Sequence, residues 1–244
     1  SINGDTVLVG PGEYPGGVNY IGKELVITST DGPSNTIINN GYSVYIGTQE
    51  GPGTVFSGFS IIGSGGGRGI EVCNDNTYAT LEDLIIYGKS DGIWMNYPEE
   101  VNISNVTITD CTTGIESNGC EDVNISNSII WFNTYFPIFK NSNCSGLNIS
   151  YSNIQGGESN IGGSSSYNWG EGNIDDNPLF CDFDTNDYSL AENSTSIGMG
   201  ALGVGCGTME DNLYYGPWYV SENGSDETGD GTIDNPFRWI QTAI

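Results

Sequence analysis

The sequence contains no histidine and only five basic residues, Lys23, Arg68, Lys89, Lys140 and Arg238. The absence of histidine removes the most frequent general base and the commonest metal ligand. With 31 acidic residues the formal net charge is −26. No basic face is therefore expected for nucleic acid, and anionic membranes and acidic polysaccharides are disfavoured as main partners.

Long hydrophobic runs are also missing. No apolar run approaches 18 residues, so we expect no insertion into a membrane. Apolar residues make up 36% of the chain, but Ile and Val recur in short regular clusters, which a disordered chain would not show. The first residues do not read as a signal peptide, which predicts a mature chain or a fragment.

Short segments of alternating apolar and polar residues recur through the middle of the chain. Corresponding positions are separated by about 22 to 25 residues, the mark of a repeat architecture. A second short motif recurs with a similar spacing: GIEV from Gly69, GIWM from Gly92, GIES from Gly114 and PIFK from Pro137. The five main segments are VFSGFSIIG from Val55, TLEDLIIYG from Thr80, VNISNVTIT from Val101, VNISNSIIW from Val123 and LNISYSNIQ from Leu147.

Each segment predicts a short strand. In VNIS, Val101 and Ile103 point to one side of the strand, while Asn102 and Ser104 point to the other. One such strand is too short to be stable alone, but layers about 4.8 Å apart would align the apolar positions in continuous ladders. A repeat near 22 residues without helical periodicity therefore predicts an all-β fold, a coil of parallel strands.

The residue between the two halves of each segment is predicted to form a sharp bend. It is Gly58, Asp83, Asn105, Asn127 and finally Tyr151. Gly, Asn and Asp tolerate left-handed backbone angles, which such a bend requires in every turn. Tyrosine does not belong to this group, so we expect the coil to distort at Tyr151.

Asparagine also recurs at equivalent positions. For Asn102, Asn124 and Asn148 two hypotheses remain open, a hydrogen-bonded ladder of amides or three solvated side chains. Repeats of Asn, Ile and Ser or Thr also create glycosylation sequons by accident. The seven sequons that could carry glycans are at Asn102, Asn105, Asn124, Asn143, Asn148, Asn193 and Asn223.

These repeats resemble the right-handed parallel β-helices of the pectin-lyase-like class, whose parallel β-helix repeats occur in many secreted proteins. INGDTVLVGPGEY from Ile2 is similar to the first strand and turn of that family, and GNIDDNPLFCDFDTNDYSL from Gly172 resembles its closing segment. The resemblance implies a β-helix over residues 1–207, closed by residues 172–207, and an extracellular location. It says little about chemistry, because this fold hosts lyases, hydrolases, adhesins and fibres.

Residues 208–244 are predicted to form a linker and a cap. WYVSENGSDETGDGTIDNPFRWIQTAI, from Trp218 to Ile244, resembles the entry of the family: a strand, an acidic Gly loop and a capping helix. The family places this entry before the first turn, whereas here it follows the coil. Open solenoid ends expose core and backbone, so they need caps.

The order of these pieces predicts that the cap segment covers the first turn of another copy. The copies would form a tandem array in one polypeptide or a head-to-tail fibre of separate chains; an arbitrarily cut fragment is the alternative. The residues expected at this interface are Trp218, Tyr219, Val220, Phe237, Trp239, Ile240 and Ile244 of the cap segment, and Val7 and Val9 of the first turn.

The function that we expect is structural: a repeat unit or subunit of an extracellular filament or surface fibre, with further copies of itself as partners. The alternative is a carbohydrate-binding or polysaccharide lyase-like β-helix. A lyase would need calcium-binding carboxylates and a basic residue as base. Arg68 and Lys89, with Glu71 and Asp91 near them in sequence, are the candidates. Basic residues on turns are usually solvated, so no catalytic residue is assigned.

Calcium is the one cofactor that the sequence suggests. Hard cations bind clustered oxygen ligands, but neither acidic stretch has the full spacing of an EF-hand loop. The two stretches place Asp182, Asp184, Asn186 and Asp187 in DFDTND, and Asp226, Glu227 and Asp230 in DETGDG.

Six cysteines without a CxxC pair do not form a zinc or redox motif. An even count suits an oxidising compartment. Cys120 and Cys144 take equivalent positions on adjacent turns, within disulfide reach. Cys181 and Cys206 flank the closing segment and form a second plausible pair. The remaining two, Cys73 and Cys111, do not align.

Overall fold

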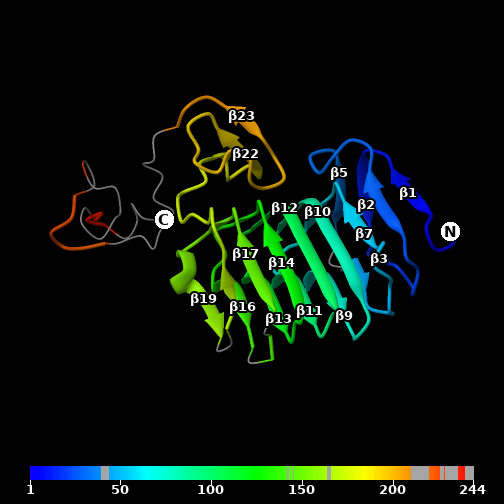
Figure 1. The fold of residues 1–244 in the computed structure, drawn as a ribbon. Helices are drawn as coiled ribbons and strands as arrows, with labels where there is room; N and C mark the ends of the chain where they lie inside the picture. Colours follow the sequence, from blue (N-terminus) through cyan, green and yellow to red (C-terminus); the bar gives the residue numbers. More distant parts are fainter. Residues whose placement is uncertain are drawn as a thin grey trace. The chain divides into compact units, whose positions relative to one another are not determined.

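The computed structural model describes residues 1–39, 44–141, 143–144, 146–163, 166–209, 220–225, 228 and 236–239. The chain divides into two compact units, Ser1–Thr208 and Met209–Ile244. The first unit is a parallel β-solenoid of about seven turns, which confirms the predicted fold class (Figure 1). Within the described residues, a single 3₁₀ turn, η1 (Gly157–Asn160), is the only helical element.

Sheet A has thirteen strands, which form two rows along the coil. Strands β10 and β12 are long enough to continue from the first row into the second. The first row is β1 (Thr6–Val9), β4 (Val26–Ser29), β7 (Val55–Ser57), β10 (Tyr78–Tyr87), β12 (Glu100–Thr109), β14 (Asp122–Ser126), β17 (Leu147–Ser150) and β20 (Asn168–Trp169). The second row adds β2 (Gly12–Pro15), β5 (Thr36–Asn39), β8 (Ser60–Ile62), β15 (Ile129–Ile130) and β18 (Asn153–Ile154).

Sheet B forms the remaining wall of the coil, and a small closing sheet follows it in sequence. Sheet B consists of β3 (Val18–Asn19), β6 (Val44–Ile46), β9 (Arg68–Cys73), β11 (Asp91–Asn96), β13 (Thr113–Asn118), β16 (Phe136–Lys140) and β19 (Ile161–Gly163), all paired in parallel. The closing sheet is β21 (Phe180–Asp182), β22 (Asp187–Ala191) and β23 (Val204–Cys206).

The predicted apolar ladder runs through the interior of the coil. Leu81 pairs with Phe56 on one side and with Ile103 on the other, and the ladder continues through Ile125 to Ile149. All five side chains are at most 1% exposed. The repeat read from the sequence is therefore the repeat of the core.

The closing sheet packs on the outer face of the second row of sheet A. Phe180, Tyr188 and Leu190 form a second apolar cluster with Ile85 and Ile129. This cluster lies outside the coil, so the two faces of this part of the second row are both covered.

The bends use the residues that the sequence predicts. Gly58, Asp83, Asn105 and Asn127 have φ angles between 48° and 82°. The expected distortion at Tyr151 is wrong, because Tyr151 adopts φ 47° and the pairing of β15 with β18 continues beyond it.

Tyr151 fits this bend because the next turn makes room for its ring. A side chain on Gly172 would overlap the ring, and the Tyr151 hydroxyl donates a hydrogen bond to Glu171. Glycine on the adjacent turn thus allows tyrosine a backbone conformation that bulky residues seldom adopt.

The three aligned asparagines form a ladder, which decides between the two hypotheses. Asn124 Nδ2 donates to Asn102 Oδ1 at 3.1 Å, and Asn148 Nδ2 donates to Asn124 Oδ1 at 3.0 Å. The middle amide both donates and accepts, so it connects three consecutive turns.

We predict that Asn124→Ala lowers the free energy of unfolding by about 1 to 2 kcal/mol, because the two amide hydrogen bonds of the ladder and the exposed one to Asp122 are lost. Ser126→Ala, on the same face of β14, is the control and should change stability by less than about 0.5 kcal/mol. Urea denaturation followed by circular dichroism measures both. Equal values for the two variants would mean that the ladder does not stabilise the coil.

Candidate functional site

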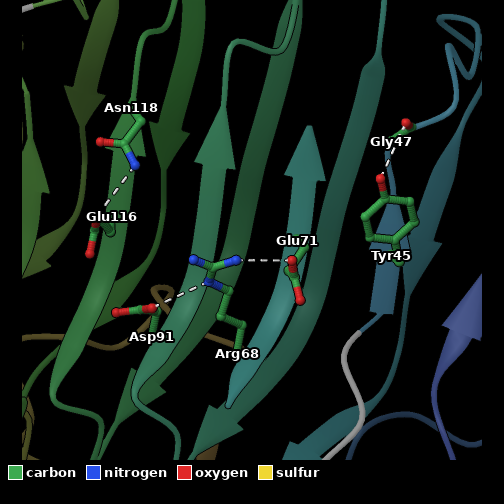
Figure 2. Close-up of polar contacts among 7 residues, drawn as sticks. All are labelled: Tyr45, Gly47, Arg68, Glu71, Asp91, Glu116 and Asn118. Atoms are coloured by element: carbon green, nitrogen blue, oxygen red, sulfur yellow. Dashed lines mark hydrogen bonds and ion pairs between the residues drawn. The ribbon is translucent and has the colours of Figure 1, made fainter. Parts of the chain in front are cut away.

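The outer face of sheet B carries Arg68, Glu71 and Asp91, three of the four residues that the sequence offers for a lyase (Figure 2). Its central row alternates aromatic and acidic side chains across adjacent strands: Tyr45, Glu71, Trp94, Glu116 and Phe139. The alternation arises because these positions pair in register and point away from the core. Figure 2 shows part of this face with its polar contacts.

Arg68 is bound to its neighbours on three sides. Its Nη1 lies 3.1 Å from Glu71 Oε2, and its Nε lies 3.6 Å from Asp91 Oδ2 (Figure 2). Its guanidinium carbon lies 3.5 Å from the centre of the Trp94 ring. A guanidinium held by two carboxylates and an aromatic face is a structural cation, because its donors are already engaged by neighbouring side chains.

The carboxyl group of Asp91 is affected by two opposing influences. Burial raises its pKa above the ordinary value, and the charge of Arg68 lowers it by a smaller amount. Arg68 therefore offsets part of the cost of burying this carboxylate. These contacts account for the position of Arg68 on sheet B without a catalytic role.

Lys89, the second lyase candidate, is not a solvated turn residue. Only 1% of it is exposed, and its Nζ has no hydrogen-bond partner within the described part of the chain. Its aliphatic stem fills the space that a side chain on Gly63 would occupy. Burial lowers the pKa of the amine. Because it is enclosed, Lys89 cannot reach a polymer at the surface.

The acidic residues of DFDTND serve the turn that contains them. Asp182 Oδ1 accepts a hydrogen bond from the Thr185 amide, and Asp187 Oδ1 accepts from the amide of Ser189. Within the described ranges, no group of three acidic, cysteine or histidine side chains could hold a metal ion. Asp226, Glu227 and Asp230 lie outside the described residues, so calcium at that loop stays a prediction.

Both expected cysteine pairs are joined by disulfides. Cys120 and Cys144 have Cα atoms 4.3 Å apart, and Cys181 and Cys206 have Cα atoms 5.8 Å apart. The two other cysteines are buried and free; burial raises the thiol pKa to about 11 for Cys73 and to about 12 for Cys111. Such thiols are poor nucleophiles.

Two observations bear on location. The disulfides are compatible with an extracellular protein. In the part of the chain that the structure describes, no helix has both the length and the apolar character of a membrane span.

The seven sequons have different surroundings. The amides of Asn102, Asn124 and Asn148 are engaged in the ladder, and Asn105 occupies a bend. Glycosylation stays a prediction, and the sequons with exposed asparagines are Asn143, Asn193 and Asn223.

Two hollows at the corner between sheet B and the first row of sheet A were missed by the sequence analysis. They have volumes of about 440 and 300 Å³, and both are lined by Asp75 and Tyr97. No repeat marks these residues, because corner loops differ in length from turn to turn. The other polar residues that line the two hollows are Gln49, Asn74 and Asn96 in the larger, and Glu99, Glu121 and Asn143 in the smaller.

The residues expected at the interface between copies lie in both units. Val7 and Val9 belong to β1, where Val7 is 37% exposed. In the second unit, Val220 and Phe237 form a parallel bridge, and the Ser221 amide donates to the Phe237 carbonyl.

The capping helix itself stays a prediction. Arg238 and Trp239 lie in a bend that follows the bridge. The remaining expected interface residues, Trp218, Tyr219, Ile240 and Ile244, lie outside the described residues.

No protein-family model, curated protein or solved structure matches this chain. The assignment of the β-solenoid fold therefore rests on the repeats and on their observed pairing.

We predict that Lys89→Met stabilises the protein at pH 7 by about 1 to 3 kcal/mol, since it removes a buried charge without a partner. The folded-state pKa of Lys89 lies below the ordinary value of 10.5. The cost is therefore present below this lowered pKa and disappears as the pH rises toward 10.5. The gain should accordingly shrink between pH 7 and pH 10 in chemical denaturation.

Lys23→Met is the matched control, because Lys23 is partly exposed and its removal should change stability by less than about 0.5 kcal/mol. A loss of stability in Lys89→Met at pH 7 would show that the buried ammonium has a stabilising role.

Proposed function

We propose that this protein is a structural unit that assembles head to tail, with the cap segment of one copy covering the first turn of the next. The contact is heterologous, so it extends into a filament rather than closing into a dimer. The proposal includes an extracellular location and a place among the right-handed β-helices of the pectin-lyase-like class.

The observation that carries the proposal is the exposure of the core at the first turn. Val7 of β1 pairs with Ile27, which in turn pairs with Phe56. Among the described residues, the exposed fraction along this ladder falls from 37% at Val7 to 8% at Ile27 and 0% at Phe56. A core-facing valine that is more than a third exposed loses much of its hydrophobic stabilisation, so a covering segment would add to stability.

The free edge of β1 offers a second means of attachment. Among the described residues, β1 pairs with β4 alone, which leaves the backbone groups of its other edge available to a further strand. Strand addition at such an edge supplies main-chain hydrogen bonds, while the apolar side chains supply burial.

The cap segment has features that suit this edge. Val220 and Trp239 are exposed by 38% and 62%, so apolar surface is available on the second unit. Joined in the order Phe237 to Ile244 and then Ser1 to Gly12, the two ends read FRWIQTAISINGDTVLVGPG, like one continuous entry segment. The resemblance of residues 218–244 to an entry segment is the reason that we assign them as a cap for the first turn of another copy.

The outer face of sheet B lends no support to the lyase alternative. Arg68 is engaged by Glu71, Asp91 and Trp94, and Lys89 is enclosed. A structural unit needs neither residue as a base, which agrees with their observed roles.

We predict that the 244-residue chain forms end-to-end filaments near 0.15 M salt, where the charge repulsion between copies is screened. Val7→Asp should block the head, and Phe237→Asp should block the tail. Neither variant should polymerise alone. An equimolar mixture should form dimers only, since one good tail meets one good head. Sedimentation velocity and electron microscopy measure these species.

Thr6→Asp, on the outward side of the same strand, is the matched control and should still polymerise. Short isolated rods of the unmodified chain at high concentration would contradict the proposal. So would polymers formed by Val7→Asp as readily as by the unmodified chain.

A further inference from the structure

The two hollows that share Asp75 and Tyr97 form a groove, here called the Tyr97 groove, which lies apart from β1 in the solenoid. Its lining residues, from Gln49 through Asn96 to Asn143, come from five consecutive turns, as the strand register shows. At about 4.8 Å per layer, the groove extends for about 20 Å along the coil. This length suits a linear ligand better than a compact one.

Tyr97 presents an aromatic ring at the middle of the groove. Its side chain is 46% exposed, yet two contacts fix the ring. One side of it lies against Gly119, where an added side-chain carbon would come within 2.5 Å of the ring, and Asn143 Nδ2 donates to its hydroxyl at 2.8 Å. A ring that is fixed in this way can stack on a ligand with little loss of conformational entropy.

The polar lining combines acceptors with donors. Asp75, Glu99 and Glu121 supply carboxylates, which only accept hydrogen bonds when ionised. Gln49, Asn74 and Asn96 supply amides, which both donate and accept. Ligands with many hydroxyl groups satisfy this mixture, because each hydroxyl both donates and accepts.

The negative charge of the groove favours neutral sugars over anionic ones. The lining contains three carboxylates and no lysine or arginine, and the whole chain carries a net charge of −26. Uronic acids and sulfated sugars would therefore be repelled. The amides along the larger hollow favour a polyhydroxylated ligand over a simple cation, which would need only the carboxylates.

We propose that the Tyr97 groove binds a linear, neutral oligosaccharide, with one sugar ring stacked on Tyr97 and its neighbours hydrogen-bonded to the carboxylates and amides on either side. Aromatic stacking together with a few convergent polar groups is the usual composition of small-ligand sites. This activity goes beyond head-to-tail assembly, since the groove does not include the first turn. An assembled filament would present one such groove per copy.

Tyr151 provides a matched comparison within the same molecule. It has the same exposed fraction of 46%, a similar φ of 47° against 54° for Tyr97, and a ring that lies over a glycine of the next turn. Neither of the two hollows includes Tyr151. The two tyrosines thus differ in their surroundings, and only Tyr97 lies among convergent polar groups.

The test uses the full chain and the variants Tyr97→Asn and Tyr151→Asn. Asparagine tolerates the left-handed backbone, so both variants should keep their melting temperatures. A glycan array of neutral oligosaccharides identifies the preferred sugar, and calorimetry with a linear hexasaccharide of that sugar measures the affinity. We expect Tyr97→Asn to weaken binding at least tenfold, while Tyr151→Asn leaves it within twofold. Assembly should be unchanged in both variants. The test of sugar binding can therefore fail without affecting the proposal of head-to-tail assembly.

Three results would overturn the proposal. The first is the absence of binding to any neutral oligosaccharide at millimolar concentration. The second is binding that Tyr97→Asn leaves intact. The third is a preference for polygalacturonate, or for the polyamine spermidine, over every neutral sugar, which would show a ligand of a different charge.

Discussion

The structure depends on the stacking of successive turns in register. A single layer of short strands has no core of its own, so each turn buries its apolar side chains against the turns on either side. Phe56 and Leu81 are fully buried because they have paired neighbours on both sides, whereas Val7 has one paired neighbour within the described residues and is 37% exposed. The interaction that stabilises the middle of the coil therefore also makes its first turn receptive to another strand. The proposed assembly is a continuation of the same contact beyond the end of the coil.

Three of the four basic residues of the solenoid are engaged with its walls or enclosed by them, and the fourth, Lys23, is partly exposed. Arg68 offsets two carboxylates on the wall of sheet B, and Lys89 is enclosed at a corner. Lys140 is 1% exposed, and its Nζ lies 4.9 Å from the centre of the Tyr167 ring. The side chains on the surface of the solenoid are therefore mainly acidic, amide-bearing and aromatic. Such a surface suits hydroxyl-rich ligands, and its negative charge opposes contact between copies over most of their surface.

Much of the fold could be predicted because its determinants repeat. The positions of Leu81 and Ile103 recur with the period of the coil, so their pairing follows from the sequence once the turns are assumed to stack. The amide ladder and the Cys120–Cys144 disulfide follow by the same alignment. Features without a repeat could not be found in this way. Tyr97 and Asp75 belong to corner loops of unequal length, which lack the alternating apolar pattern that marks the strands.

The sequence by itself determined the parallel coil, its register and its bends, because period and alternation are local properties that stacking preserves. The tertiary structure decided the positions of side chains that do not follow the repeat, such as Lys89 and Tyr151. It enclosed Lys89 where a solvated lysine was expected, since Gly63 on an adjacent turn leaves space for its stem. It let Tyr151 adopt a bend that disfavours tyrosine, since Gly172 accommodates the ring. In each case the deciding partner lies on an adjacent turn, distant in the sequence, and only the folded coil brings the two together.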